Sequence, residues 1–291
     1  MATYIALLIN ILLLLTKNIS AEDLVGLHQD DPQLIKIIKD KHLNFHQKGS
    51  TYNFTKNPNM KGQYGQAEAI EKLFKGKRNG FFVEAGAFDG ENISNTLVFE
   101  MKYNWTGLLV EPNPDLYRDL ITKNRRATSI ETCFSTERKV VSIEFDAAGA
   151  YGGIIGHNKP GQRPTEKRDY KIKTNKNFKP DPVYHTYQRN TIKLECLPFT
   201  SIIMALGNPT IDYLSLDIEG AEYPVLKTID FEKCDIKVIS VENTKLGATF
   251  DGTDTQLRYH LQNNGYRLYQ TVGEDVIYAK TEFLRQMNDE V

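Results

Sequence analysis

Three acidic residues each close a mostly apolar run of the chain, and their side chains could bind a ligand. These residues are Glu84, Glu111 and Asp217. In parallel α/β sheets, ligands bind beyond the carboxyl ends of the central strands, so the three carboxylates should face one pocket. A pyrophosphate prefers bare backbone amides to carboxylates. The acids better suit hydroxyl groups and a cation such as the amino group and sulfonium of S-adenosylmethionine.

Glycines surround the first of these acids in the order Glu84-x-Gly86-x-x-x-Gly90. Gly86 would let a ligand approach the backbone closely, and Gly90 would free the start of the next helix from side-chain clashes. Phe88 stands where a dinucleotide fingerprint requires its second glycine. The pattern therefore predicts a cofactor loop of another kind, and an ordinary strand-to-helix turn without a ligand is the alternative.

Glu111 follows Glu84 by 27 residues and closes the second predicted strand. In nucleotide-binding α/β folds an acid at this place binds both ribose hydroxyls of an adenosine, which is the role we expect here. A solvent-facing acid at a strand end is the alternative. Glu219 follows Asp217 closely, and either carboxylate could be a general base. Both could instead be acids at a helix N-terminus that favour the helix dipole.

The elements that must position these residues alternate between strands and helices. The pattern predicts a mostly parallel central sheet closed by an antiparallel hairpin, an α/β arrangement that separates methyltransferases from simple dehydrogenases. Predicted strands occupy residues 81–84, 107–111, 128–133, 140–145, 191–196, 211–217, 236–242, 266–270 and 276–280. Predicted helices occupy residues 66–75, 91–102, 114–121, 197–206 and 255–264.

Composition is that of a globular protein, with 40% hydrophobic and 25% charged residues among 291. The net charge of −1 gives no reason to expect a nucleic-acid partner. With three cysteines and no Cys-x-x-Cys, the sequence predicts no metal site. Residues 157–190 are basic and without periodicity, which predicts an inserted surface loop. Residues 283–291 are expected to be a tail.

The first 21 residues predict the compartment. Their apolar run of twelve residues suits a signal peptide, and an uncleaved type II membrane anchor is the alternative. Either one places the rest in the endoplasmic reticulum or Golgi lumen, or outside the cell. Residues 22–63 then read as an N-terminal arm. In that compartment we expect glycans on Asn53 and Asn104, within Asn-x-Thr triplets, and a disulfide between Cys133 and Cys196, which flank the insertion.

Three motifs resemble those of the FkbM-type methyltransferase domain over residues 64–282. They are VEAGAFDG at 83–90, LVEPN at 109–113 and LDIEGAE at 216–222. Three further segments make the sequence similar to the animal branch of this family, which includes the insect protein Star. They are SNT at 94–96, WTGL at 105–108 and CLP at 196–198. The resemblance implies a Rossmann-like class I methyltransferase fold with S-adenosylmethionine as cofactor. It places Glu84, Gly86 and Gly90 at the methionine end, Glu111 at the ribose, and Asp217 at the edge of the transfer site.

Two functions from different classes follow from this resemblance. One is a lumenal O-methyltransferase that acts on a small molecule or glycan, with Asp217 or Glu219 as the base. The other is a non-catalytic, Star-like factor in vesicle-mediated trafficking between the endoplasmic reticulum and the Golgi, whose partner is a protein cargo such as a growth-factor precursor. A membrane is expected as a partner only if residues 1–21 remain as an anchor. Binding of S-adenosylmethionine together with methyl transfer would separate the two.

Overall fold

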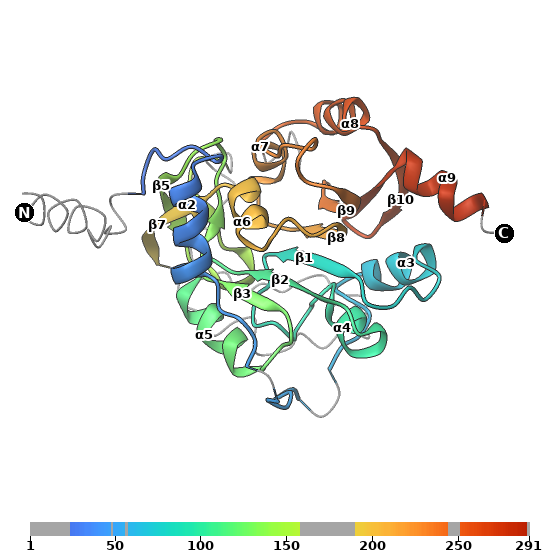
Figure 1. The fold of residues 1–291 in the computed structure, drawn as a ribbon, viewed down its shortest axis with the longest axis horizontal. Helices are drawn as coiled ribbons and strands as arrows, with labels where there is room; N and C mark the ends of the chain where they lie inside the picture. Colours follow the sequence, from blue (N-terminus) through green and yellow to red (C-terminus); the bar gives the residue numbers. More distant parts are fainter. Residues whose placement is uncertain (1–23, 48, 56–57, 158–189, 244–250, 290–291) are drawn as a thin grey trace, which may run out of the picture.

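The computed structural model describes residues 24–47, 49–55, 58–157, 190–243 and 251–289 (Figure 1). The expected signal peptide or anchor at residues 1–21 lies outside these ranges. The basic insertion at 157–190 also lies outside them, apart from its first and last residues. Within the described residues, no helix combines the length and the apolar composition needed to cross a membrane.

In the described part of the chain, seven strands form the central sheet in the order β10-β11-β9-β8-β1-β2-β3. The first five in sequence are β1 (Phe81–Ala85), β2 (Thr106–Val110), β3 (Thr128–Ile130), β8 (Ile211–Leu216) and β9 (Ile236–Glu242). These five pair in parallel, whereas β11 (Asp275–Lys280) runs antiparallel to β9 and to β10 (Tyr266–Val272). The predicted mostly parallel sheet with a C-terminal antiparallel hairpin is confirmed, and the fold is a Rossmann-like α/β fold.

Helices cover both faces of this sheet, which explains why its central strands are nearly continuous apolar runs. All six residues of β8 are buried, as are four of the five in β1. One face carries α3 (Gln66–Leu73), α4 (Leu97–Tyr103), α5 (Pro114–Thr122) and α9 (Thr281–Asp289). The other carries α2 (Pro32–Ile37), α6 (Phe199–Ala205), α7 (Glu222–Leu226) and α8 (Asp254–Asn263) (Figure 1).

A second sheet in the described residues has the order β4-β7-β5-β6. Its strands are β4 (Cys133–Phe134), β5 (Val141–Asp146), β6 (Gly153–Ile154) and β7 (Thr191–Leu197). The predicted strand over residues 128–133 is thus divided, because β3 pairs with β2 while β4 pairs with β7. Cys133 and Cys196 are opposite each other in that pairing and form a disulfide, the pair expected from the sequence.

The helix expected at residues 91–102 begins only at Leu97. The Asp89 carboxylate accepts the backbone N–H groups of Glu91 and Asn92, as an N-cap residue does, but no helix follows directly. Ile93 has a positive φ of 55°, which a right-handed helix does not allow. Residues 86–96 therefore form an irregular loop, called the glycine loop below.

The described part of the predicted N-terminal arm is packed against the domain. Leu34 in α2 and Ile38 in the following one-turn π-helix (Ile38–His42) are fully buried in the main core. Asp31 caps α2 by accepting the N–H of Gln33. The expected tail at residues 283–291 mostly belongs to α9, which begins at residue 281. The two segments share one feature. Their apolar residues are few, but on a helix a few such residues are enough to bury one face.

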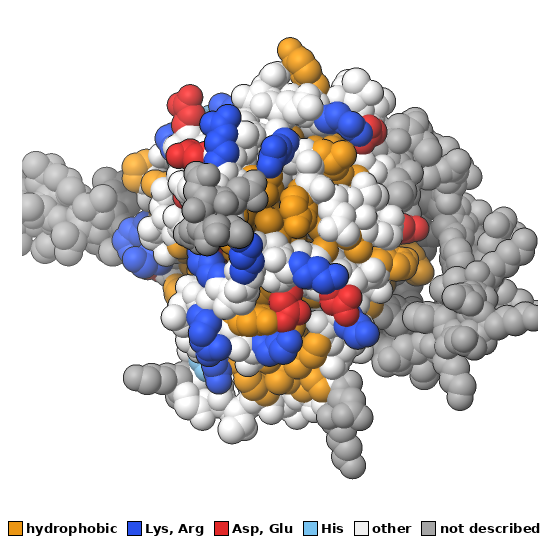
Figure 2. All heavy atoms as spheres, turned by 90° about the vertical axis from the view of Figure 1, so that its right-hand side faces the viewer, with side chains coloured by type: hydrophobic (Ala, Val, Ile, Leu, Met, Phe, Trp, Pro, Cys, Tyr) orange, Lys and Arg blue, Asp and Glu red, His pale blue; other side chains and the backbone are white. Residues whose placement is uncertain are grey.

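The edge of the central sheet at β10 exposes apolar side chains, with Leu268 and Tyr269 about two-fifths exposed. Figure 2 shows the molecule from the side where Figure 1 draws α3 and α9, next to this edge. Lys and Arg side chains are interspersed there with Asp, Glu and hydrophobic ones, so this face carries both signs of charge.

Candidate functional site

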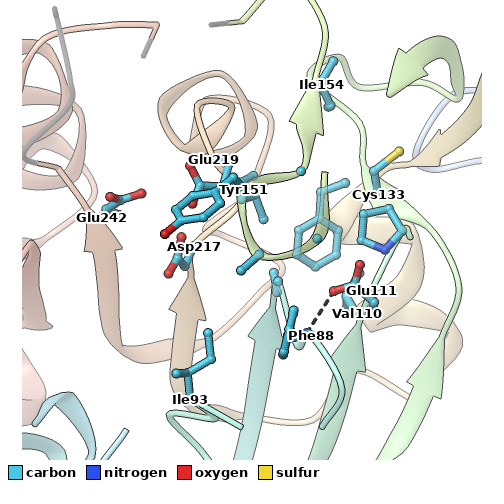
Figure 3. Close-up of a pocket in the computed structure, with 18 of the residues that line it drawn as sticks. Phe88, Ile93, Val110, Glu111, Cys133, Tyr151, Ile154, Asp217, Glu219 and Glu242 are labelled. Carbon is cyan, nitrogen blue, oxygen red and sulfur yellow. Dashed lines mark hydrogen bonds between the residues drawn. The ribbon is translucent and has the colours of Figure 1, made fainter. Parts of the chain in front are cut away.

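A cavity lies at the carboxyl ends of β1, β2 and β8 and is bounded on its other side by the second sheet (Figure 3). Its volume is about 1040 Å³ when space open to solvent is included. Most of the side chains that line it are apolar or aromatic groups or carboxylates. The apolar and aromatic ones include Tyr64, Phe88, Ile93, Val110, Phe134, Phe145, Tyr151 and Ile154, and the acidic ones are Glu111, Asp217, Glu219, Glu242 and Glu274.

Glu111 is held rigidly in the wall of this cavity, where β2 ends. One carboxylate oxygen accepts the N–H of Phe88 at 2.9 Å, and the other accepts the N–H of Asn113 at 2.8 Å (Figure 3). The residue is 4% exposed, and burial, reinforced by the charge of Asp89, raises the pKa of its carboxyl to about 8. Two amides thus orient a buried acid whose remaining lone pairs are suited to accept hydrogen bonds from hydroxyl groups.

Gly86 also lines the cavity, in a left-handed conformation with φ of 79°. A Cβ on this residue would lie 1.9 Å from the backbone carbonyl oxygen of Asp217. The Asp217 N–H in turn donates to the carbonyl of Ala85 at 3.2 Å. The sequence predicts that this glycine makes room for a ligand. In the structure, the backbone at the end of β8 also leaves no room for a side chain here.

Glu84 and Gly90 are absent from the described residues that line the cavity. The Glu84 carboxylate is buried and accepts the Ser94 hydroxyl, the Asn95 N–H and the Thr96 hydroxyl at 2.5–2.8 Å. The Gly90 carbonyl accepts a hydrogen bond from an arginine behind the loop. The sequence predicts that both residues contact a cofactor, and that contact stays a prediction. They hold the glycine loop from behind.

Asp217 and Glu219 meet a third acid, Glu242, at the opposite end of the cavity from Glu111 (Figure 3). One carboxylate oxygen of each lies within 4.8 Å of the others. Glu242 is buried and the other two are half-buried. Carboxylates this close repel one another when all are ionised, which favours the sharing of a proton or a cation between them. The group can therefore take up a proton, which is what a general base must do.

The backbone around Glu219 ties this acidic group to the second sheet. Glu219 has a positive φ of 56°, unusual for a residue with a side chain. Its carbonyl oxygen would lie 2.8 Å from a Cβ on Gly153 in β6. Glu222, buried behind the turn, accepts the N–H groups of Ile218 and Gly220 at 2.8 and 3.0 Å. Burial, together with the charge of Glu242, raises the pKa of Glu222 to about 7.

Sequence reasoning missed Glu242 and Tyr151 as residues of this site. Glu242 closes the predicted strand 236–242 just as Glu111 closes an earlier one, so the same strand-end signal could have found it. Tyr151 belongs to a short 3₁₀ turn (Gly149–Tyr151) of the second sheet, next to Asp217 and Glu219 in Figure 3. No periodicity marks a turn of this kind, because it is positioned by the strands on either side.

The remaining predicted sites lie elsewhere. Asn53 and Asn104 are both exposed, where an attached sugar could extend into solvent. The amide group of Asn53 donates to the carbonyl of Thr122, and that of Asn104 donates to Asn79. Cys133, in contrast, lines the cavity near Glu111, so the disulfide with Cys196 braces one wall of the site (Figure 3).

Comparisons with known proteins show a family and a similarity to a solved structure. Residues 84–268 match the family described as Methyltransferase FkbM domain. Magnesium protoporphyrin IX methyltransferase (ChlM) from Synechocystis PCC 6803, solved with bound SAM, shares 8% identity and a TM-score of 0.35, covering 74% of this chain and 78% of that one. The chain matches no curated protein sequence. Since the family match spans more than half of the 291 residues, the chain belongs to the FkbM methyltransferase domain family.

Proposed function

We propose that this protein is an S-adenosylmethionine-dependent O-methyltransferase. The observation that carries the proposal is Glu111, a buried carboxylate at the end of the second parallel strand. Two backbone amides already orient it, so its free lone pairs are aimed rather than mobile. An acid at this place in a nucleotide-binding sheet binds ribose hydroxyls. Membership of the FkbM family supports the same cofactor.

The cavity lining divides into parts that match the parts of this cofactor. Glu111 would accept the ribose hydroxyls, and the apolar side chains of Val110 and Phe134 beside it would contact the adenine. Gly86 and Asp217 lie toward the other end, where the amino group and sulfonium would be near a carboxylate. Bound S-adenosylmethionine supplies a methyl group that its positive sulfur has already activated.

The acidic group at the far end would act on the acceptor. Asp217 or Glu219 would remove the proton from an acceptor hydroxyl, and Glu242 nearby would favour proton uptake by like-charge repulsion. Alignment of the acceptor oxygen by the cavity does the remaining work, since methyl transfer needs little other acid–base chemistry. A small molecule or a glycan fits this requirement, because either one offers hydroxyl groups.

Methyl transfer from tritiated S-adenosylmethionine to a panel of monosaccharides and polyols tests the proposal. We expect product with the wild type. Asp217→Asn and Glu219→Gln are compared as isosteric variants. Loss of the base should lower the rate by about 10²–10⁴-fold while cofactor affinity stays within a few-fold. The variant with that pattern identifies the base, and a rate unchanged in both would exclude this role for either.

We also propose that the protein works in the secretory pathway, in the endoplasmic reticulum or Golgi lumen, or outside the cell. The disulfide between Cys133 and Cys196 supports this, because such bonds persist in oxidising compartments. The apolar run in residues 1–21 supports it independently. Fusion of residues 1–30 to a reporter tests it, and the reporter should enter the secretory pathway. Cytosolic retention of the reporter would contradict this localisation.

A Star-like, non-catalytic trafficking role is the second candidate function. The disulfide favours it equally, since it also requires a lumenal protein. In that role the cavity could keep cofactor affinity without turnover, and the partner would be a protein cargo such as a growth-factor precursor. Delayed exit of such a precursor from the endoplasmic reticulum after depletion of the protein, restored equally by wild type and Asp217→Asn, would favour this role over the enzyme.

A further inference from the structure

Arg125 lies behind the glycine loop, on the turn between α5 and β3, and does not line the cavity. Its side chain is 2% exposed, and its Nε donates to the Glu100 carboxylate at 3.0 Å. Such a deeply buried cation is costly unless its charge and its donors are satisfied. The guanidinium achieves this with partners on the loop as well as on α4, so its position and that of the loop are interdependent.

Three of these partners belong to the glycine loop. The guanidinium donates to the Gly90 carbonyl at 2.6 Å, the Ser94 hydroxyl at 3.3 Å and the Thr96 hydroxyl at 3.2 Å. Its planar fork reaches these acceptors in fixed directions, which a lysine ammonium could not reproduce. A single side chain thus spans the loop from Gly90 to Thr96.

The same two hydroxyls point their own protons at Glu84. Ser94 donates to the Glu84 carboxylate at 2.8 Å and Thr96 at 2.5 Å, while the Asn95 N–H donates to its other oxygen at 2.6 Å. Burial raises the pKa of Glu84, and the charge of Arg125 together with these bonds opposes that rise. Arg125 therefore helps to keep a charged acceptor at the end of β1, around which the loop is wound.

The loop held in this way carries two residues of the cavity wall. Ile93 lies between the Arg125 partners Gly90 and Ser94 and lines the cavity with a positive φ of 55°. Phe88, with φ of 53°, donates the N–H that orients Glu111. Both are backbone conformations that a residue with a side chain seldom adopts unless its surroundings impose them.

We propose that Arg125 is the positioning residue of the glycine loop: its guanidinium sets the backbone from Gly90 to Thr96 and thereby the part of the cavity wall formed by Ile93. Arg125 does not line the cavity, so it acts through the loop. The consequence for cofactor affinity rests on the proposed function. The consequence for the loop itself does not.

The test uses the full chain with its disulfide intact and compares Arg125→Met with Arg125→Lys. Arg126→Met is the matched control, because the Arg126 side chain is exposed. In the described part of the chain it donates to Asn104 and lies over the ring of Tyr52, both outside the glycine loop. Amide hydrogen exchange is followed first, without ligand. Loss of charged hydrogen bonds should speed exchange of the Asn95 amide by about tenfold or more in Arg125→Met. The exchange rate of the Asp217 amide, which bridges β8 and β1, should be unchanged. That result would separate release of the loop from general destabilisation.

Titration with S-adenosylmethionine follows, and the affinity should fall about tenfold or more in Arg125→Met, less in Arg125→Lys, and not at all in Arg126→Met. Unchanged Asn95 exchange in a folded Arg125→Met protein would overturn the proposal, as would a loosened loop with unchanged cofactor affinity. If neither Arg125 variant folds, Arg125 is required for folding as a whole, and the proposal of a specific role in the loop is overturned too. If Arg125→Met loosens the loop but the wild type does not bind S-adenosylmethionine, the proposed function is rejected and the role of Arg125 in the loop is kept.

Discussion

The backbone carbonyl oxygen of Asp217 lies where a side chain on Gly86 would begin, 1.9 Å from the position of a Cβ. Two parallel strands, β1 and β8, therefore leave the sheet with their backbones in direct contact. Gly86 begins the glycine loop, and Asp217 begins the acidic end of the cavity. The contact sets the spacing between the part of the site that would hold a cofactor and the part that would act on an acceptor.

Gly86→Ala should be strongly destabilising, because the new methyl group must push β8 away and because φ is positive. Gly265→Ala is the matched control, since Gly265 has φ of 86° and nothing within 4 Å of its Cβ position. We expect the control to lose about 1–2 kcal/mol from its backbone conformation and Gly86→Ala to lose about 1–3 kcal/mol more. Urea unfolding measures both. Equal losses would mean that the contact with Asp217 carries no cost.

Affinity for S-adenosylmethionine should depend on pH through Glu111. Its pKa of about 8 in the free protein means that the carboxyl is mostly protonated at pH 7. Ribose hydroxyls donate to the ionised form, so binding releases a proton and affinity should rise with pH until about pH 8 and then level off. Calorimetry in buffers of different ionisation enthalpy measures the released proton. Glu111→Gln should show weaker binding without this dependence, and an equal slope in that variant would assign the proton elsewhere.

Removal of the disulfide should destabilise the domain. Cys133 and Cys196 are 63 residues apart, and a cross-link over a long loop contributes about 2–4 kcal/mol. The Cys133→Ala, Cys196→Ala double variant should lose about that amount in denaturant unfolding and should no longer respond to reductant. Cys234→Ala removes the buried free thiol and is the control, which should keep the reductant response. A double variant as stable as the oxidised wild type would show that the cross-link contributes nothing.

Glycan attachment should distinguish three Asn-x-Ser/Thr triplets. Asn53 and Asn104 are exposed, and in secretory expression each of Asn53→Gln and Asn104→Gln should remove one glycosidase-sensitive step in gel mobility. Asn92→Gln should remove none, because Asn92 is half-buried and Ser94 of its triplet is buried, with its hydroxyl donating to Glu84. A step lost only with Asn92→Gln would contradict this assignment.

The strands of the central sheet and the acids that close them could be predicted from the sequence. Buried parallel strands are apolar on both faces, so Asp217 and Glu111 were recognisable as the first polar residues after such runs. The hairpin after residue 265 was recognisable from its two short β-rich segments and its turn. These features are local, and each depends on a few neighbouring residues only.

The roles of the loop residues could not be predicted in the same way, because they depend on distant partners. Glu84 looked like a ligand-binding acid, but Ser94 and Thr96 take up its carboxylate, and Arg125 stabilises that arrangement from another turn of the chain. The positive φ of Ile93, which delays α4, likewise leaves no periodic signal. The roles of these residues depend on contacts between distant parts of the chain, which the spacing of apolar residues does not reveal.

The most direct test of the central claim is isothermal titration of S-adenosylmethionine into the wild type and into Glu111→Ala. The account predicts saturable binding of one cofactor per wild-type chain. Loss of the charged acceptor should cost about 1.5–3 kcal/mol, which lowers affinity about 10–100-fold in Glu111→Ala. No binding to the folded wild type at millimolar cofactor, or equal affinity in the two proteins, would contradict the assignment of this cavity to S-adenosylmethionine.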